Sequence, residues 1–281
     1  MRCPICDSNK LISKFRLEDD SVFADNGKLT FILCKECDFL FNPKGLELTP
    51  EDIKSYYQSF LTYDQAADKV LAQLDVFLRW RLSYLSFLEK CISRNTMKQM
   101  RILDIGGSAG QFCFLMKQKG FFQCDLLDYS KTHVNIGKNI FRIKHTYTDI
   151  DQITEPYDLY ILNHTIEHIA DPVNYLNTLL KNHKNTHIFI STPNHRSVGS
   201  ILYKQKWLLL REHHISLFSK KSISSLYERT GLVLQNYDGF RMYSANPIVM
   251  LKGLIGNLIK SKSRQKKFLA TDGLCAYGCQ K

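Results

Sequence analysis

Residues 102–110 read Ile-Leu-Asp-Ile-Gly-Gly-Ser-Ala-Gly, which is an apolar strand followed by a glycine-rich turn. A helical pattern begins at once, with apolar residues at three- and four-residue steps: Ala109, Phe112, Leu115 and Met116. A second apolar segment, 124–127, ends in a carboxylate, Asp128. In open α/β sheets, nucleotide-like cofactors bind at the carboxyl ends of the strands, where glycines let the backbone approach and an acid holds ribose hydroxyls. The stretch therefore predicts a cofactor that contains a nucleoside.

Strand-like and helical segments alternate from Arg101 onward. We expect strands at 101–105, 123–128, 144–147, 158–163, 187–191 and 232–237. We expect helices at 109–119, 130–140, 171–181 and 221–229. Alternation with short connections predicts an α/β fold with a mostly parallel sheet that helices cover on both faces.

Two cysteine pairs, Cys3-Pro-Ile-Cys6 and Cys34-Lys-Glu-Cys37, are separated by 27 residues near the N-terminus. Each pair suits a tight turn that directs two sulfurs to one point, and four thiolates complete a tetrahedral zinc shell. The intervening stretch has few core-forming residues, so a metal would supply stability that its small core lacks. Because the shell has no open position, the predicted role is structural. Two disulfides, or iron in place of zinc, are the alternatives.

The chain divides into four predicted parts by motif and composition. These are a zinc-ribbon module at 1–45, a helical linker or cap at 46–99, a cofactor-binding domain at 100–245, and a basic C-terminal segment at 246–281 that completes or flanks the sheet. The linker opens on Thr49-Pro50, a capped helix start, and apolar residues then recur at helical spacing from Val70 to Leu85.

The composition excludes several classes of protein. The 281 residues are 44% hydrophobic, so extensive disorder is not expected. No run of about 18 apolar residues predicts a spanning helix, and no apolar targeting segment follows Met1. Nine cysteines without such a segment favour reduced thiols, so we expect a cytoplasmic protein.

The net charge of +11 is unusual and fits three kinds of partner: nucleic acid, a membrane surface, or an anionic small molecule. A solvated basic surface with no such partner explains it equally well. Segment 248–268 combines apolar residues with lysines and could lie on an anionic membrane. We favour the alternative for this segment, a helix that packs in the core and is followed by a basic loop.

The glycine turn does not fit the dinucleotide fingerprint Gly-x-Gly-x-x-Gly. What remains is Asp-x-Gly-x-x-x-Gly, in which Asp104 precedes the turn. A carboxylate at this position would repel a pyrophosphate but attract the ammonium group of an amino acid. This charge argument favours S-adenosylmethionine, which carries an amino-acid group on a nucleoside.

Four segments in order resemble class I S-adenosylmethionine-dependent methyltransferases, a Rossmann-like family, over roughly residues 100–240. They are 103–110, 127–130, 148–150 and 158–172, and segment 191–194 adds to them. One departure is Ser108, which stands where the family has its middle glycine. A serine is small enough for the turn but has less backbone freedom than glycine.

The resemblance implies which residues hold the two ends of the cofactor. Asp104 and the backbone of Gly106, Gly107 and Gly110 would hold the methionine group. Asn163 would line the cofactor near the methyl group.

At the nucleoside end, Asp128 would accept both ribose hydroxyls, with Tyr129 beside the adenine. Asp149 would receive the adenine amino group, and Ile150 would pack near the ring. For the two aspartates, the alternative is an acid that caps the next turn.

A four-cysteine module ahead of such a domain is similar to bacterial methyltransferases that modify sugar nucleotides and other cell-surface or secondary metabolites. The similarity implies an enzyme with a small-molecule acceptor, and the net charge of +11 favours an anionic one.

Methyl transfer is an in-line displacement in which the enzyme aligns the acceptor and excludes water. A hydroxyl or an acidic C–H acceptor needs a base, for which histidine is suited near neutral pH. In the family, a Glu-His pair beyond the fourth strand faces the acceptor, which implies His168 as the base and Glu167 as its neighbour. Capping of backbone groups is the alternative, and a divalent ion on this pair would need further ligands.

His213 and His214 follow the fifth strand, in a region that covers the acceptor in relatives. We count both as candidate site residues, with a solvated loop as the alternative.

These observations predict methyl transfer from S-adenosylmethionine to a nucleotide-linked sugar or a related precursor. The alternative is a methyltransferase of ribosomal RNA bases in which the zinc module aids RNA binding, because basic charge suits RNA. A protein that keeps the fold without catalysis is a third hypothesis.

Overall fold

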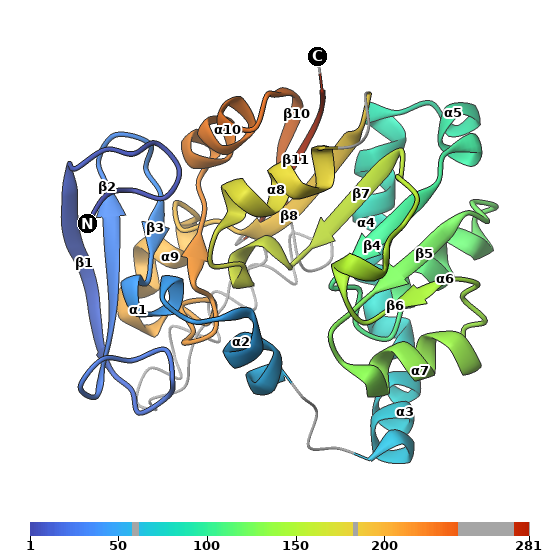
Figure 1. Cartoon of the computed structure of the whole chain (residues 1–281), viewed down its shortest axis with the longest axis horizontal. Helices are drawn as coiled ribbons and strands as arrows, with labels where there is room; N and C mark the ends of the chain where they lie inside the picture. Colours follow the sequence, from blue (N-terminus) through green and yellow to red (C-terminus); the bar gives the residue numbers. More distant parts are fainter. Residues whose placement is uncertain (58–61, 182–184, 241–272, 281) are drawn as a thin grey trace. The chain divides into compact units, whose positions relative to one another are not determined.

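The computed structural model describes residues 1–57, 62–181, 185–240 and 273–280 (Figure 1). Segment 248–268, for which the sequence leaves membrane contact open, lies outside the described residues. No described helix is both long enough and apolar enough to cross a membrane.

The first half of the chain carries an N-terminal group of strands, a run of helices and the first strands of a larger sheet. Its elements are β1 (Leu11–Glu18), β2 (Lys28–Cys34), β3 (Leu40–Phe41), α1 (Pro43–Leu46), α2 (Pro50–Tyr57), α3 (Tyr63–Ala72), α4 (Leu74–Cys91), α5 (Arg94–Gln99), β4 (Ile102–Ile105), α6 (Gln111–Gln118), β5 (Cys124–Leu127) and α7 (Lys131–Asn139).

The second half continues the alternation and adds three short 3-10 helices. Its elements are β6 (Thr146–Tyr147), η1 (Ile150–Gln152), β7 (Leu159–Asn163), η2 (Ile166–His168), α8 (Pro172–Leu180), β8 (His187–Pro193), α9 (Val198–Tyr203), η3 (Lys204–Lys206), β9 (Ser216–Leu217), α10 (Lys220–Arg229), β10 (Leu232–Phe240) and β11 (Gly273–Gln280).

A seven-stranded sheet has the strand order β10-β11-β8-β7-β4-β5-β6. Strand β4 pairs in parallel with β5 and with β7, and β5 pairs in parallel with β6. Every residue of β4, β5 and β7 is buried, which explains why these segments are apolar with few exceptions. The predicted α/β fold with a mostly parallel sheet is confirmed.

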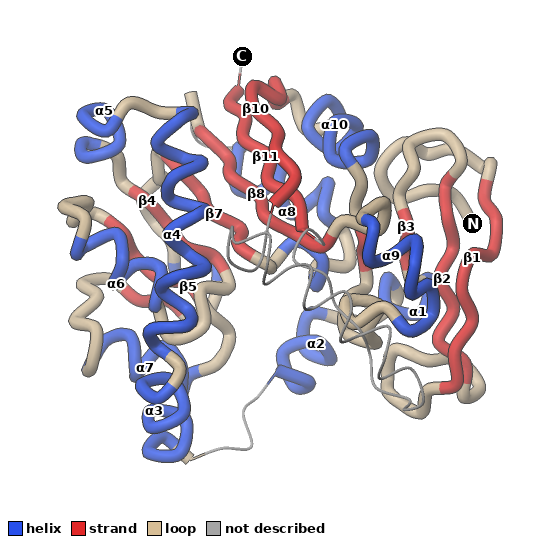
Figure 2. The backbone as a smooth tube through the Cα atoms, turned by 180° about the vertical axis from the view of Figure 1, so that it is seen from behind, coloured by secondary structure: helices blue, strands red, loops and turns tan. Residues whose placement is uncertain are grey.

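The chain changes direction across this sheet at β4. From β4 it proceeds outward through β5 to β6, and it then returns to the other side of β4 as β7. Such a switch opens a crevice at the carboxyl ends of the central strands, where ligands bind in α/β folds. Figure 2 shows α4 running across this part of the sheet, where it contacts α6.

The turn after β4 passes through left-handed backbone conformations. Gly106 has φ 68° and Gly110, the residue before α6, has φ 83°. Ser108 has φ 54°, so a serine adopts the conformation that the family's glycine would take more easily. The turn therefore keeps its shape despite the departure in sequence.

Most predicted elements agree with the structure to within three residues, and two differ in substance. The helical pattern from Val70 to Leu85 is two helices, α3 and α4, which meet at Gln73. The stretch between the cysteine pairs was expected to have few core residues, and this prediction is wrong. Strand β2 buries Leu29, Phe31 and Leu33 because it alternates inward and outward side chains, and Phe23 in the connection before it is buried as well.

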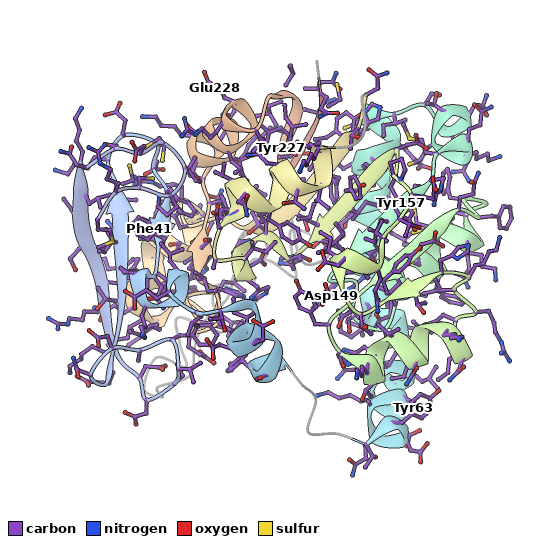
Figure 3. All side chains as sticks on the ribbon, viewed as in Figure 1. Phe41, Tyr63, Asp149, Tyr157, Tyr227 and Glu228 are labelled. Carbon is purple, nitrogen blue, oxygen red and sulfur yellow. The ribbon has the colours of Figure 1, made fainter. Side chains whose placement is uncertain are left out.

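The N-terminal strands belong to a separate four-stranded sheet of order β1-β2-β3-β9. Strand β1 pairs antiparallel with β2, and β2 with β3. Phe41 of β3, labelled in Figure 3, is fully buried and stacks on Phe39. The last strand of this sheet, β9, comes from far along the chain and begins two residues after His214.

The chain forms two compact units. Unit 1 contains residues 1–48, 166–177 and 191–276, and unit 2 contains residues 49–165, 178–190 and 277–281. Unit 2 therefore carries the glycine turn, whereas unit 1 carries the cysteine pairs and the candidate histidines. The four-part division drawn from the sequence stays a prediction.

We expect Gly110→Ala to destabilise the protein by about 2 kcal/mol or more. Alanine is strained at a φ of 83°, and its Cβ would collide with the side chain of Ile143. Urea unfolding measures the change. Ser108→Gly in the same turn is the matched variant: it relieves a φ of 54° and should leave stability unchanged or raise it by up to about 1 kcal/mol. Equal losses in both variants would contradict the argument.

Candidate functional site

Asp104, at the end of β4, is a buried carboxylate with only 1% of its surface exposed. Its Oδ1 atom has no hydrogen-bond partner among the described residues. Burial raises the pKa of Asp104 to about 7, while the nearby Arg81 guanidinium lowers it and Asp128 raises it. An unsatisfied buried carboxylate costs free energy, so this atom is suited to receive a cationic donor from a ligand.

Asp128, at the end of β5, accepts two backbone hydrogen bonds. Ser108 N donates to one oxygen at 2.8 Å and Ser130 N donates to the other at 2.9 Å. These are the contacts of a capping acid, the alternative that the sequence left open. Each oxygen has a second lone pair, so the same carboxylate could also accept hydroxyl hydrogens. Burial raises the pKa of Asp128 above its usual range.

Tyr129 and Asp149 lie in neighbouring loops of the same unit. Burial raises the pKa of Tyr129, and the charges of Asp149 and Asp128 raise it further. Asp149, labelled in Figure 3, caps η1 by accepting from Asp151 N at 3.3 Å. Its partner in this capping box is Gln152, and Ile150 between them is partly exposed. These side chains form one edge of the candidate cofactor site.

Asn163 ends β7 on the other side of β4 and is 7% exposed. Two residues later, Thr165 Oγ1 donates to the carbonyl of Ile105 at 2.7 Å. A Cβ on Gly106 would lie 2.5 Å from the same hydroxyl, so only glycine fits there. All of the predicted cofactor residues thus lie at or after the carboxyl ends of β4, β5, β6 and β7: Asp104, Gly106, Gly107, Gly110, Asp128, Tyr129, Asp149, Ile150 and Asn163.

This set fits S-adenosylmethionine in chemistry. A buried carboxylate without a partner suits the ammonium group, and the loop acids offer acceptors for hydroxyl and amino groups. A Cβ added at Gly106 or Gly107 would collide with the side chain of Thr165 or Asp104, so the turn has no room for a larger residue there.

Two residues of this region were missed by the sequence analysis. Arg81 lies close enough to Asp104 to shift its pKa, and its guanidinium stacks over Phe77 at 5.0 Å. The available signal was a cation between Leu78 and Leu85 on an otherwise apolar helix face. The second is Thr165, for which the sequence offered no comparable signal.

In unit 1, three imidazoles pack against one another, and Glu167 lies beside two of them, His168 and His214. The His168 ring lies 5.5 Å from the His213 ring and 5.0 Å from the His214 ring. Nδ1 of His168 donates to the carbonyl of His213 at 2.9 Å, and Nδ1 of His214 donates to the carbonyl of Leu209 at 2.7 Å. A carbonyl only accepts, so both protons sit on Nδ1 and both Nε2 atoms carry a lone pair.

Burial favours the neutral forms of His213 and His214. Burial, followed by the nearby His168, lowers the pKa of His213 to about 4, and the same causes lower the pKa of His214 well below its usual range. Glu167 is completely buried, whereas His168 is partly exposed. The structure therefore brings all four predicted residues together, as a packed cluster with no resemblance to a solvated loop.

The four cysteine sulfurs of unit 1 also converge. Sγ of Cys3 lies 3.5 Å from that of Cys37, and Sγ of Cys6 lies 3.6 Å from that of Cys34. All four lie within 4.8 Å of one another, and all are free thiols. A tetrahedral shell with zinc–sulfur bonds of about 2.3 Å spaces its sulfurs about 3.8 Å apart, so the set fits zinc.

The N-terminal sheet holds the histidine-bearing loop. Strand β3 pairs with β9, with Leu40 opposite Leu217 and Phe41 opposite Ser216. The ladder extends to Asn42 N, which donates to the carbonyl of Ile215 at 2.8 Å. Because Ile215 directly follows His214, these bonds anchor the loop that carries two of the three imidazoles.

One protein-family model and several solved structures match this chain. Residues 73–236, more than half of the chain, match the family described as a methyltransferase domain. A search of curated proteins found no sequence match.

Among solved structures, a SAM-dependent methyltransferase from Leishmania major matches with 15% identity and a TM-score of 0.52, over 82% of each chain. A SAM-dependent methyltransferase from Archaeoglobus fulgidus matches with 15% identity and a TM-score of 0.49, over 71% of this chain and 94% of that one. A SAM-dependent methyltransferase from Thermotoga maritima, described as a possible histamine N-methyltransferase, matches with 15% identity and a TM-score of 0.48, over 76% of this chain and 95% of that one. At such identities, likeness concerns the fold alone.

Proposed function

The chain belongs to the methyltransferase-domain family and is a class I S-adenosylmethionine-dependent enzyme, and from this premise we propose that it methylates an anionic small molecule. The proposed acceptor class is a nucleotide-linked sugar or a related precursor of cell-surface or secondary metabolites. S-adenosylmethionine, when bound, supplies an electrophilic methyl group on a sulfonium.

In this proposal, unit 2 binds the cofactor. Asp104 holds the ammonium group, an assignment supported by its buried oxygen without a partner. Asp128 and Asp149 receive the ribose and adenine groups, with Tyr129 and Ile150 beside the ring. Gly106, Gly107 and Gly110 admit the methionine group, and Asn163 lines the methyl end.

His168 is the proposed base, and one observation carries this assignment. Donation from its Nδ1 to the His213 carbonyl fixes the tautomer, so Nε2 presents a lone pair on a partly exposed ring. An acceptor hydroxyl or acidic C–H could give its proton to this atom as the methyl transfers. Glu167, His213 and His214 orient the ring and exclude water around it.

A basic cavity in unit 1, whose lining includes none of Glu167, His168, His213 and His214, could hold the anionic part of an acceptor. Its volume is about 830 Å³, within the range of small-molecule sites. Its cationic lining consists of Lys14 from β1, Arg196, and Lys204 and Lys206 from η3, with Phe15 and Ile201 among the apolar residues. The pair between Arg196 and Asp38 offsets the charge of Arg196, so the three lysines supply most of the positive charge of the lining.

Four cysteines are the proposed ligands of one structural zinc ion: Cys3, Cys6, Cys34 and Cys37. The ion would join the two turns of the N-terminal sheet, whose strand β3 in turn anchors the loop of His213 and His214. Zinc would therefore support the acceptor side of the enzyme without touching the acceptor.

The function is tested by an acceptor screen on the zinc-loaded chain, with release of S-adenosylhomocysteine as the readout. We expect turnover with nucleotide-linked sugars and little with the same sugars lacking the diphosphate. Preferential methylation of ribosomal RNA would overturn the proposal.

With the acceptor found by that screen, His168→Asn should lower kcat by about 100-fold or more. The asparagine amide keeps a donor near the position of Nδ1 for the His213 carbonyl but removes Nε2. Cofactor affinity should stay within about threefold of wild type, because the ring makes no proposed cofactor contact. His145→Asn, at an exposed histidine, is the control. An unchanged kcat in His168→Asn would contradict the assignment of His168 as the base.

Binding of S-adenosylhomocysteine, which keeps the ammonium group, should release protons. At pH 6.5 most Asp104 carboxyls are protonated, since burial raises the pKa of Asp104 to about 7 and only Arg81 opposes this among the charges facing it. The ammonium favours the ionised form, so we expect roughly half a proton released per ligand and tighter binding as pH rises from 6 to 7.5. Calorimetry in buffers of different ionisation enthalpy measures this.

Asp104→Asn should abolish the proton release and weaken binding at least tenfold, as an estimate for losing a charge-assisted hydrogen bond. The control is Asp151→Asn, at an exposed acid beside the same site. If the release persists in Asp104→Asn, the proton comes from another group, and Asp128 is then the residue to test.

Cys34→Ser should lower the zinc content from about one ion per chain and reduce the midpoint of thermal unfolding. It should impair methyl transfer more than S-adenosylhomocysteine binding, because the cysteines and the cofactor residues belong to different compact units. Metal analysis measures the zinc content, and scanning calorimetry measures the unfolding midpoint. The matched control is Cys91→Ser on α4. Equal zinc content in the two variants would refute the assignment.

A further inference from the structure

Glu167, His168 and His214 form a second group of metal-ligating side chains, distinct from the cysteines. One ligand atom from each residue can be chosen so that all three lie within 4.8 Å of one another. The first two come from η2, and the third comes from the loop before β9. Elements far apart in the chain thus converge on one point.

Both histidines are oriented as metal ligands usually are. In metal sites, a ligating histidine donates its other ring N–H to a carbonyl or carboxylate, which fixes the tautomer. Here the His168 and His214 rings do so to the carbonyls of His213 and Leu209, at 2.9 and 2.7 Å. Each neutral ring therefore carries its lone pair on Nε2.

The third ligand, the carboxylate of Glu167, would supply negative charge to the ion. Glu167 is fully buried, and His214 is 6% exposed, so an ion between them would be shielded from water on most sides. His168 is partly exposed, which leaves a route of entry. Two neutral imidazoles with one carboxylate form a donor set that divalent transition metals accept while leaving coordination positions open.

We propose that Glu167, His168 and His214 bind one divalent transition-metal ion, through one carboxylate oxygen and the two Nε2 atoms. Imidazole nitrogen favours zinc, cobalt, nickel, copper or iron over calcium, magnesium and manganese. The binding site does not depend on the methyl-transfer proposal. A bound ion would nevertheless occupy the lone pair on Nε2 of His168. If this atom is the base in methyl transfer, binding of the ion at this site should inhibit the enzyme.

Cobalt(II) is the probe, added to the full chain after its cysteines have been loaded with zinc. Zinc holds a tetrathiolate site more tightly than cobalt, so the added ion should not displace it. We expect one cobalt per chain by calorimetry, with the weak visible absorption of nitrogen and oxygen ligands. Strong thiolate charge-transfer absorption, or no binding, would overturn the proposal.

The decisive variants are Glu167→Gln and His214→Asn, each of which should weaken cobalt binding at least tenfold. His214→Asn keeps a donor for the Leu209 carbonyl and removes only Nε2. The matched controls are Glu212→Gln, at the neighbouring acid that contacts His213, and His145→Asn, at an exposed histidine. Undiminished binding in both decisive variants would overturn the assignment.

A measurement on the wild-type chain covers the case in which a buried variant fails to fold. Proton NMR of the cobalt-bound protein should show two strongly shifted exchangeable signals, from the Nδ1–H groups of His168 and His214. Their absence in the cobalt-loaded chain would rule out this pair of ligands. None of these cobalt-binding measurements needs turnover. A failure to bind cobalt therefore leaves the methyl-transfer proposal standing, and a failure of methyl transfer leaves the metal site standing.

Discussion

Parallel strands direct their carboxyl ends to one edge of a sheet, and the cofactor half of this protein depends on that constraint. Because β4 lies between β5 and β7, the loops after three central strands meet at the point where the chain changes direction. Asp104, Asp128 and Asn163 then need no special spacing in the sequence, only positions at strand ends. The left-handed turn from Gly106 to Gly110 follows from the same constraint, since the backbone must leave β4 and enter α6 within five residues.

The histidine cluster depends on a different kind of interaction, which is antiparallel pairing between distant segments. Strand β9 is only two residues long, and its pairing with β3 makes it part of the N-terminal sheet. Those few backbone bonds hold the preceding loop, so that His214 reaches the ring of His168. The cysteine pairs belong to the same sheet, with Cys34 at the end of β2 and Cys37 shortly before β3.

Burial acts in opposite directions at the two sites. It raises the pKa of the acid Asp104 and lowers the pKa of the base His214, and in both cases it favours the neutral form. In the proposed cofactor complex, an ammonium group would restore the charge on the aspartate. Neutral imidazoles, in contrast, keep the lone pairs on which either proton transfer or metal ligation depends.

Local patterns in the sequence determined the fold class, the order of strands and helices, the glycine turn with its acid, and the two cysteine pairs. Periodicity, turn chemistry and short-range spacing carry that information within a few residues of each position. Tertiary structure alone decided that Arg81 faces Asp104, that Thr165 closes on Gly106, and that His214 joins Glu167 and His168. These contacts join segments far apart in the chain, and they depend on sheet pairing and helix packing that no local pattern specifies.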